Sequence, residues 1–134
     1  MKRLLIALAL IGLPLLAVGS GNPRAKEQSL KEHLSATLMR SKLEHSNKVL
    51  EGLTTEDFGT IAKEAQAMRG LTVLERWFRA DTPQYKAQLN SFWYANDALA
   101  KAADEKNLDG ATLAYTQLTI SCVNCHKHVR AATK

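Results

Sequence analysis

The chain has 134 residues, of which 46% are hydrophobic and 23% charged, and its formal net charge at pH 7 is +5. This length and composition predict one domain with a real hydrophobic core and exclude two domains of ordinary size. The basic residues are scattered among acidic ones, without the Lys/Arg runs and interleaved aromatic residues of a nucleic-acid-binding surface. We therefore expect no nucleic-acid partner.

Residues 1–21 have the layout of a secretory signal peptide. Lys2 and Arg3 form a basic start, an apolar run follows, and small residues end the segment, so we expect cleavage after Gly19 or Gly21. The alternative is an uncleaved membrane anchor, for which the unbroken apolar run is short of the usual length of about 20 residues. Removal of the segment leaves 16 basic and 13 acidic side chains. The expected location is the periplasm or another exported compartment.

Residues 22–134 are predicted to form one almost entirely helical domain. They are rich in Ala, Leu, Lys, Glu and Gln, and they show no sustained alternation of apolar and polar residues. A first helix is expected from about Ala25 to Leu53, with two apolar stripes that indicate contact with two other helices. The stripes are Leu30, Leu34, Leu38 and Ser41 on one side, and Met39, Leu43, Ser46, Leu50 and Leu53 on the other.

Capping signals predict the second and third helices. The second helix should begin at "TTED", with Thr54 or Thr55 as its cap, and extend to about Phe78. Thr82 followed by Pro83 predicts the cap and first residue of the third helix. Expected to point inward are Phe58, Ile61, Ala65, Met68 and Leu71 in the second helix and Tyr85, Leu89, Phe92, Asn96, Leu99 and Ala103 in the third.

The fourth helix is expected to start with Asp109 as its cap, in the turn "NLDGA", and to extend to about Ala131. All the connections are short, and short connections make consecutive helices antiparallel neighbours. The predicted fold is therefore all-α, an antiparallel up-down-up-down four-helix bundle.

The stretch "TISCVNCHKH" contains both cysteines of the chain. Cys122, Cys125, His126 and Val129 follow the spacing i, i+3, i+4 and i+7, which puts them on one helix face. A zinc site would need a second Cys/His pair at the right spacing, and a thioredoxin-like pair would need a βαβ unit; the sequence has neither. A disulfide between these positions of a regular helix would be strained. The spacing C-x-x-C-H is instead that of c-type haem attachment.

The segments "CVNCHKHVR" and "TLMRSKLEHSNKVLEGL" resemble the class II c-type cytochromes, the family of cytochrome c′ and its low-spin relatives. Family members are four-helix bundles with the motif C-x-x-C-H-x-x-[YF]-R near the C-terminus. The resemblance implies one covalently bound haem c, attached through Cys122 and Cys125, with His126 as the proximal iron ligand and Arg130 in the same motif. Met39 looks like the first-helix methionine that is the sixth iron ligand in the low-spin branch.

Two positions depart from the family's pattern. Val129 stands where an aromatic residue is usual, and Ser35 stands where an arginine is often found. The other histidines are interpreted without ligand roles: His33 as solvated, His45 as a partly buried core residue, and His128 as exposed. Some of the aromatic residues should line the haem pocket and others the core; these are Trp77, Phe78, Phe92, Trp93 and Tyr94.

Two functions are compatible with this pattern. With Met39 as sixth ligand, the protein would be an exported mono-haem electron carrier with redox proteins as partners. Without that ligand, a five-coordinate iron would bind nitric oxide or carbon monoxide. No Ser/His/Asp set, acid pair or distal acid–base histidine points to an enzyme, so no catalytic residue is expected. A homodimer stays open.

Overall fold

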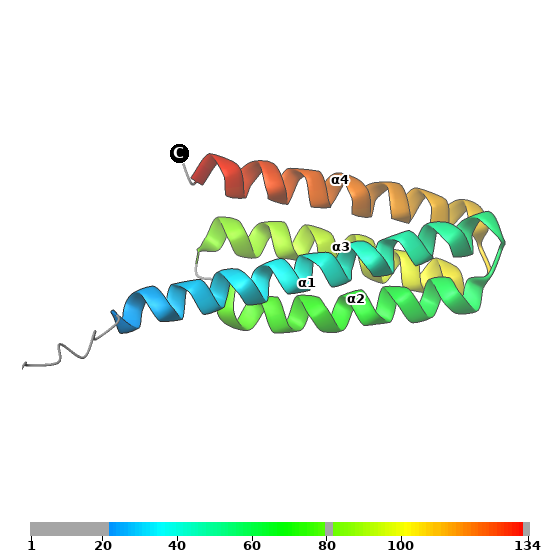
Figure 1. Cartoon of the computed structure of the whole chain (residues 1–134). Helices are drawn as coiled ribbons and strands as arrows, with labels where there is room; N and C mark the ends of the chain where they lie inside the picture. Colours follow the sequence, from blue (N-terminus) through cyan, green and yellow to red (C-terminus); the bar gives the residue numbers. More distant parts are fainter. Residues whose placement is uncertain (1–21, 80–81, 133–134) are drawn as a thin grey trace, which may run out of the picture.

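The computed structural model describes residues 22–79 and 82–132. They form four helices, and the up-down-up-down four-helix bundle predicted from the sequence is confirmed (Figure 1). The predicted signal peptide lies outside the described residues. The helices are α1 (Pro23–Thr54), α2 (Phe58–Arg79), α3 (Pro83–Asp104) and α4 (Leu108–Ala132).

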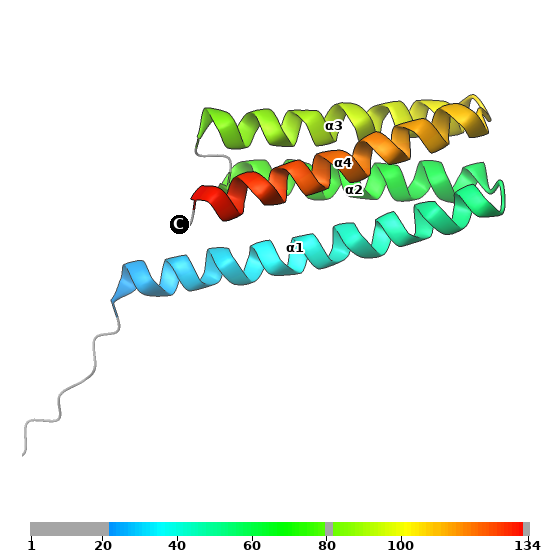
Figure 2. The same cartoon turned by 90° about the horizontal axis from the view of Figure 1, so that it is seen from above.

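The first helix is the longest of the four. Its 32 residues begin after Asn22, whose side chain accepts a hydrogen bond from the backbone N–H of Arg24 at 3.1 Å, and Pro23 occupies the first turn. The start of α1 reaches beyond the neighbouring ends of α2 and α3 (Figures 1 and 2). Among the described helices, none combines the length and the apolar character needed to cross a bilayer.

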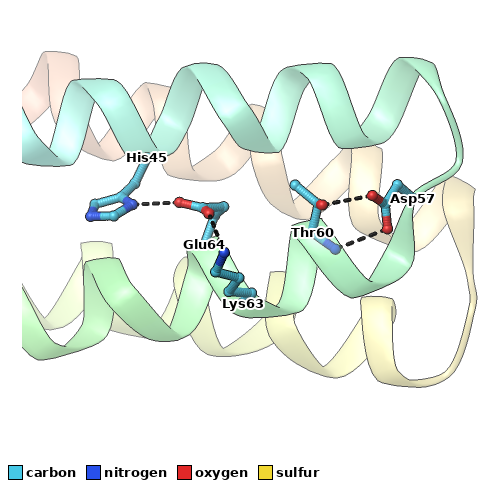
Figure 3. A network of polar contacts seen from close by, with 5 residues as sticks. All are labelled: His45, Asp57, Thr60, Lys63 and Glu64. Atoms are coloured by element: carbon cyan, nitrogen blue, oxygen red, sulfur yellow. Dashed lines mark hydrogen bonds and ion pairs between the residues drawn. The ribbon is translucent and has the colours of Figure 1, made fainter.

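The cap of α2 is Asp57, not Thr54 or Thr55 as predicted. The Asp57 carboxylate accepts a hydrogen bond from the backbone N–H of Thr60 at 3.0 Å, and its second oxygen accepts one from the Thr60 hydroxyl at 2.6 Å (Figure 3). The hydroxyls of Thr54 and Thr55 instead donate to the carbonyl of Glu51, at 2.8 and 2.9 Å. Thr54 and Thr55 therefore supply hydrogen-bond donors to a carbonyl at the end of α1, and Asp57 accepts the hydrogen bonds at the start of α2.

A comparable correction applies to α4. Asn107 accepts a hydrogen bond from the backbone N–H of Gly110 at 2.9 Å and so caps the helix, whereas the predicted cap, Asp109, lies inside its first turn. There its negative charge still complements the positive end of the helix dipole. The predicted cap of α3 is confirmed, because the Thr82 hydroxyl accepts a hydrogen bond from the backbone N–H of Tyr85 at 3.1 Å.

The bundle consists of two similar helical hairpins. The first, α1–α2, turns after Thr54, and the second, α3–α4, turns after Asp104, which lies 50 positions later. Each turn contains one residue in the left-handed region at the same relative position, Glu56 with φ 55° and Lys106 with φ 53°. Each is followed by an Asp or Asn cap. This correspondence allows the two hairpins to be compared position by position.

The inward residues predicted for α2 and α3 are confirmed as buried or half-buried. Asn96 is also buried, and its side-chain amide donates to the carbonyl of Ala65 at 2.8 Å. The largest apolar core residues with almost no exposure are Val49, Ile61, Met68, Leu99 and Leu118.

The stripes predicted for α1 are confirmed only in part: Leu53 is buried and Leu38, Met39, Ser41 and Ser46 are half-buried, but four leucines are exposed. Leu43 and Leu50 are 62% and 49% exposed, and Leu30 and Leu34 are also exposed. The buried positions of α1 are Lys42, Val49, Gly52 and Leu53, of which only Leu53 was predicted. The reason is that α1 packs closely along α2 but has few contacts with α4, so one of its sides stays uncovered (Figure 2).

Candidate functional site

The two cysteines lie on the inner side of α4, where Cys122 is one turn and Cys125 two turns beyond the buried Leu118. Both are half-buried free thiols. The i, i+3 spacing brings them to the same side of the helix as the core residue that precedes them. His126 follows on this side but is exposed.

This side of α4 borders a cavity of about 660 Å³. Its size is within the range of about 300–1,000 Å³ that is typical of small-molecule and cofactor sites. All four helices contribute to its wall, which is mainly apolar. The wall consists of Ala36, Met39, Arg40, Lys42, Leu43 and Ser46 from α1, Met68 and Glu75 from α2, Gln88, Leu89 and Phe92 from α3, and Leu118, Thr119, Cys122, Val123, Cys125 and His126 from α4.

Four of the five predicted site residues meet at this cavity. Cys122, Cys125 and His126 line it from α4, and the half-buried Met39 lines it from α1. Arg130 is exposed and is not part of the wall. The cavity therefore unites the cysteine motif with the first-helix methionine, which lie more than 80 positions apart in the sequence.

Comparison of the two hairpins explains why a cavity is found here. The interface between α2 and α3 corresponds to the one between α1 and α4, but it is closely packed. Trp93 of α3 is half-buried in the former, against the guanidinium groups of Arg69 and Arg76 from α2. The position 50 residues earlier is Leu43, which points largely to solvent. The interface between α1 and α4 thus lacks a counterpart of this aromatic contact.

A buried polar cluster forms one side of the cavity. The ammonium group of Lys42 donates to Oε2 of Glu75 at 2.5 Å, and the Tyr85 hydroxyl donates to Oε1 of the same carboxylate. Lys42 is 9% exposed and Glu75 only 1%. The Lys42 nitrogen also lies 4.5 Å from the centre of the Phe92 ring, a cation–π contact. Three helices, α1, α2 and α3, meet in this cluster.

Both thiols are harder to ionise than an exposed cysteine. Burial raises the pKa of Cys122 above its ordinary value of 9.0, against an opposing effect of the Lys42 charge. Burial also raises the pKa of Cys125, and the carboxylate of Glu75 raises it further. Since the thiolate is the form that is readily oxidised, both side chains stay protonated and comparatively inert near neutral pH.

The remaining histidines agree with the predictions in two cases of three. His33 is exposed, and His45 is half-buried, with Nδ1 at 2.5 Å from the Glu64 carboxylate (Figure 3). His128, predicted to be exposed, is half-buried. The reason is its spacing: it lies one turn beyond Cys125 on the same side of α4, three residues further along.

The structure distinguishes the aromatic residues that line the cavity from those that do not, which the sequence left undecided. Phe92 lines the cavity. Trp77 and Tyr94 are 87% and 74% exposed and belong to neither the cavity nor the core. Trp93 is half-buried under the guanidinium group of Arg69, which lies 4.9 Å from the ring centre.

Lys42 and Glu75 were not recognised in the sequence as site residues. Position 42 lies one turn from Met39, but a lysine at the edge of an apolar stripe usually indicates a solvated side chain. The only sequence signal is the correspondence of the two hairpins, in which Lys42 takes the position of the core residue Phe92.

Comparison of the chain with models of known protein families, with curated proteins and with solved structures gave no match. The site is therefore interpreted from its own residues. They suit a haem group: an apolar cavity of cofactor size, two thiols on one rim, and an imidazole and a thioether on two facing helices.

Proposed function

We propose that this protein is an exported mono-haem c-type cytochrome that transfers electrons. Haem supplies a one-electron redox couple at its iron. Cys122 and Cys125 would hold it through thioethers, His126 would be the proximal ligand, and Met39 the sixth. The observation that carries the proposal is the single cavity lined by these four side chains.

Attachment requires no oxidant. Each thiol would add across one haem vinyl group, so that a sulfur–carbon bond would form and the thiol hydrogen would move to the other vinyl carbon. The thiols must remain reduced until then. The raised pKa of both side chains supports this requirement, because protonated thiols resist oxidation.

The four-helix scaffold supports the assignment of roles. Since α4 is a regular helix, Cys122, Cys125 and His126 keep a fixed spacing, so a haem held by the two cysteines would have the His126 imidazole within reach as a ligand. Met39 lies on a helix that packs closely on α2, while few contacts link α1 to α4, where a large flat group would have to enter. Apolar wall residues such as Leu89 and Phe92 would exclude water from the ring.

The test of the cofactor is expression with export and haem-maturation machinery. We expect a pigmented protein whose haem resists acid–acetone extraction and whose intact mass includes one haem. The control is the double variant Cys122→Ala, Cys125→Ala, which should carry no covalent haem. Freely extractable haem in the unsubstituted protein, or none at all, contradicts the proposal.

The sixth ligand is tested by Met39→Leu. The change keeps a similar volume, so its cost in stability should be below about 1.5 kcal/mol. We expect the low-spin spectrum of the unsubstituted protein to become high-spin and carbon monoxide to bind. Met68→Leu is the matched control, because Met68 lines the same cavity from α2, and its spectrum should not change. An unsubstituted protein that is already high-spin would favour gas binding over electron transfer.

A further inference from the structure

The buried ion pair between Lys42 and Glu75 has no evident role in stability. Taking two charges out of water is costly, and apolar residues in their place are often neutral or stabilising. The pair nevertheless lies in the wall of the cavity, with the carboxylate almost fully buried. A function that needs fixed charges at this point therefore explains the buried pair better than a contribution to stability does.

The charges of the pair are held in a defined arrangement. One oxygen of Glu75 accepts from Lys42 and the other from Tyr85, so the carboxylate is fixed from α1 and from α3. Lys42 is held in turn against the Phe92 ring. The rest of the wall is mainly apolar, and its polar members are Arg40, Ser46, Gln88, Thr119 and His126. The electrostatic effect of the pair should therefore reach across the cavity.

The two cysteines line the same cavity as the ion pair: Cys122 and Cys125 contribute to its wall from α4, and Lys42 and Glu75 contribute from α1 and α2. The cysteine sulfur atoms are the attachment points in the proposed function. Any group bound through them lies within range of the same two charges.

We infer that Lys42 and Glu75, oriented by Tyr85, set the reduction potential of the haem. This inference rests on the proposed function and assigns two tuning residues to its site. A carboxylate beside the cavity favours the oxidised, more positive iron and lowers the potential. An ammonium group has the opposite effect. The pair thus holds two opposing contributions in balance.

The experiment measures midpoint potentials of the purified holoprotein at pH 8. In Glu75→Gln, loss of the negative charge leaves Lys42 uncompensated, and we expect the equilibrium constant for reduction to rise about tenfold. Tenfold corresponds to 59 mV for a one-electron couple. In Lys42→Met the potential should fall. The double variant should return close to the original value, because both charges are gone.

The matched control is Glu105→Gln. It removes the same charge from an exposed pair with Lys101, at about 20 Å along α3 from Phe92, and should leave the potential unchanged. Should Glu75→Gln fail to fold, Tyr85→Phe provides a milder variant. Loss of the hydroxyl donor leaves the negative charge of Glu75 less neutralised. The reduction potential of Tyr85→Phe should therefore fall, but by less than the reduction potential of Lys42→Met.

Opposite shifts in the two single variants support the inference. Shifts in the same direction, or a shift in Glu75→Gln no larger than in Glu105→Gln, overturn it while the cytochrome assignment stands. Absence of covalent haem from the unsubstituted protein overturns the proposed function, and this inference with it. The two failures are distinguished by mass measurement before any potential is recorded.

Discussion

His45 and Glu64 join α1 to α2 by a contact of 2.5 Å between Nδ1 and Oε2, and Glu64 is only 4% exposed (Figure 3). The hydrogen bond from His45 is the main cause that lowers the pKa of Glu64 below its ordinary value of 4.5, with smaller contributions from Lys48 and Lys63. A carboxyl group whose pKa is lower in the folded state stabilises the fold above its ordinary pKa. This stabilisation is lost as the pH falls through the folded-state value.

We therefore predict a pH-dependent effect of Glu64→Gln. At pH 7 the variant should lose about 1.5–3 kcal/mol of unfolding free energy, as expected for a hydrogen bond to a charged group. The difference from the unsubstituted protein should shrink as the pH is lowered from 5 to 3. Urea denaturation across this range measures it. Glu105→Gln serves as the control, with a loss below about 1 kcal/mol because its ion pair is exposed. A difference that is the same at pH 3 and pH 7 contradicts the interpretation.

At the scale of single residues, Met39 was selected from the resemblance of the first helix to a known family. Cys122, Cys125 and His126 could be selected from the sequence itself, because the C-x-x-C-H spacing and helical periodicity suffice for that choice. Lys42 and Glu75 could not, since a charged residue is normally exposed and their pairing joins positions 33 apart. Leu43 and Leu50 were misjudged for the converse reason. Periodicity defines a stripe but does not say which neighbouring helix covers it.

The turns show how helix ends are determined. Gly52 lies two residues before the end of α1, and no described glycine has a positive φ. Its role is close packing, because a Cβ there would lie 2.9 Å from Cγ1 of Ile61 and 3.2 Å from the carbonyl oxygen of Asp57. The left-handed position is occupied by Glu56 instead. The sequence located this turn within a few residues.

Two glycine substitutions should accordingly have opposite effects. Gly52→Ala forces the turn against α2, and we expect a loss of about 1–3 kcal/mol, as for overpacked sites. Gly70 lies in the exposed middle of α2, and a Cβ added there by Gly70→Ala would have no atom within 4 Å. The substitution should stabilise the protein by up to about 1 kcal/mol through helix propensity. Thermal and urea denaturation of both variants provide the measurement. Equal effects of the two would mean that the contact with Ile61 is not limiting.

For the whole molecule, the bundle was predictable because caps, breakers and short connections all point to four antiparallel helices. The opening between α1 and α4 was not. It depends on Lys42 and Leu43, which occupy the positions where the second hairpin has Phe92 and Trp93. This difference can be recognised only when the structures of the two hairpins are compared position by position. The fold therefore follows from local signals, whereas the site depends on the one helix interface that does not close.

This open interface gives the last prediction, which concerns hydrogen exchange. Near the cavity, α1 and α4 are joined by Ser46 and Tyr115, whose hydroxyls lie 3.2 Å apart, and few other contacts link the two helices. A group that binds only the folded state and touches both helices should stabilise this interface. Backbone amides of residues 36–46 and 118–126 should then exchange more slowly in the holoprotein than in the haem-free variant Cys122→Ala, Cys125→Ala.

The turn between α1 and α2 provides the internal control for that comparison. Residues 52–61 lie at the far end of the bundle from the N-terminal half of α1, and their contacts are complete without a cofactor, including the caps and the buried Ile61 (Figure 1). Their exchange should be alike in both proteins. Protection that rises equally in the turn and around the cavity would indicate global stabilisation. Local protection would show that the cofactor completes the interface that the side chains of α1 and α4 leave open.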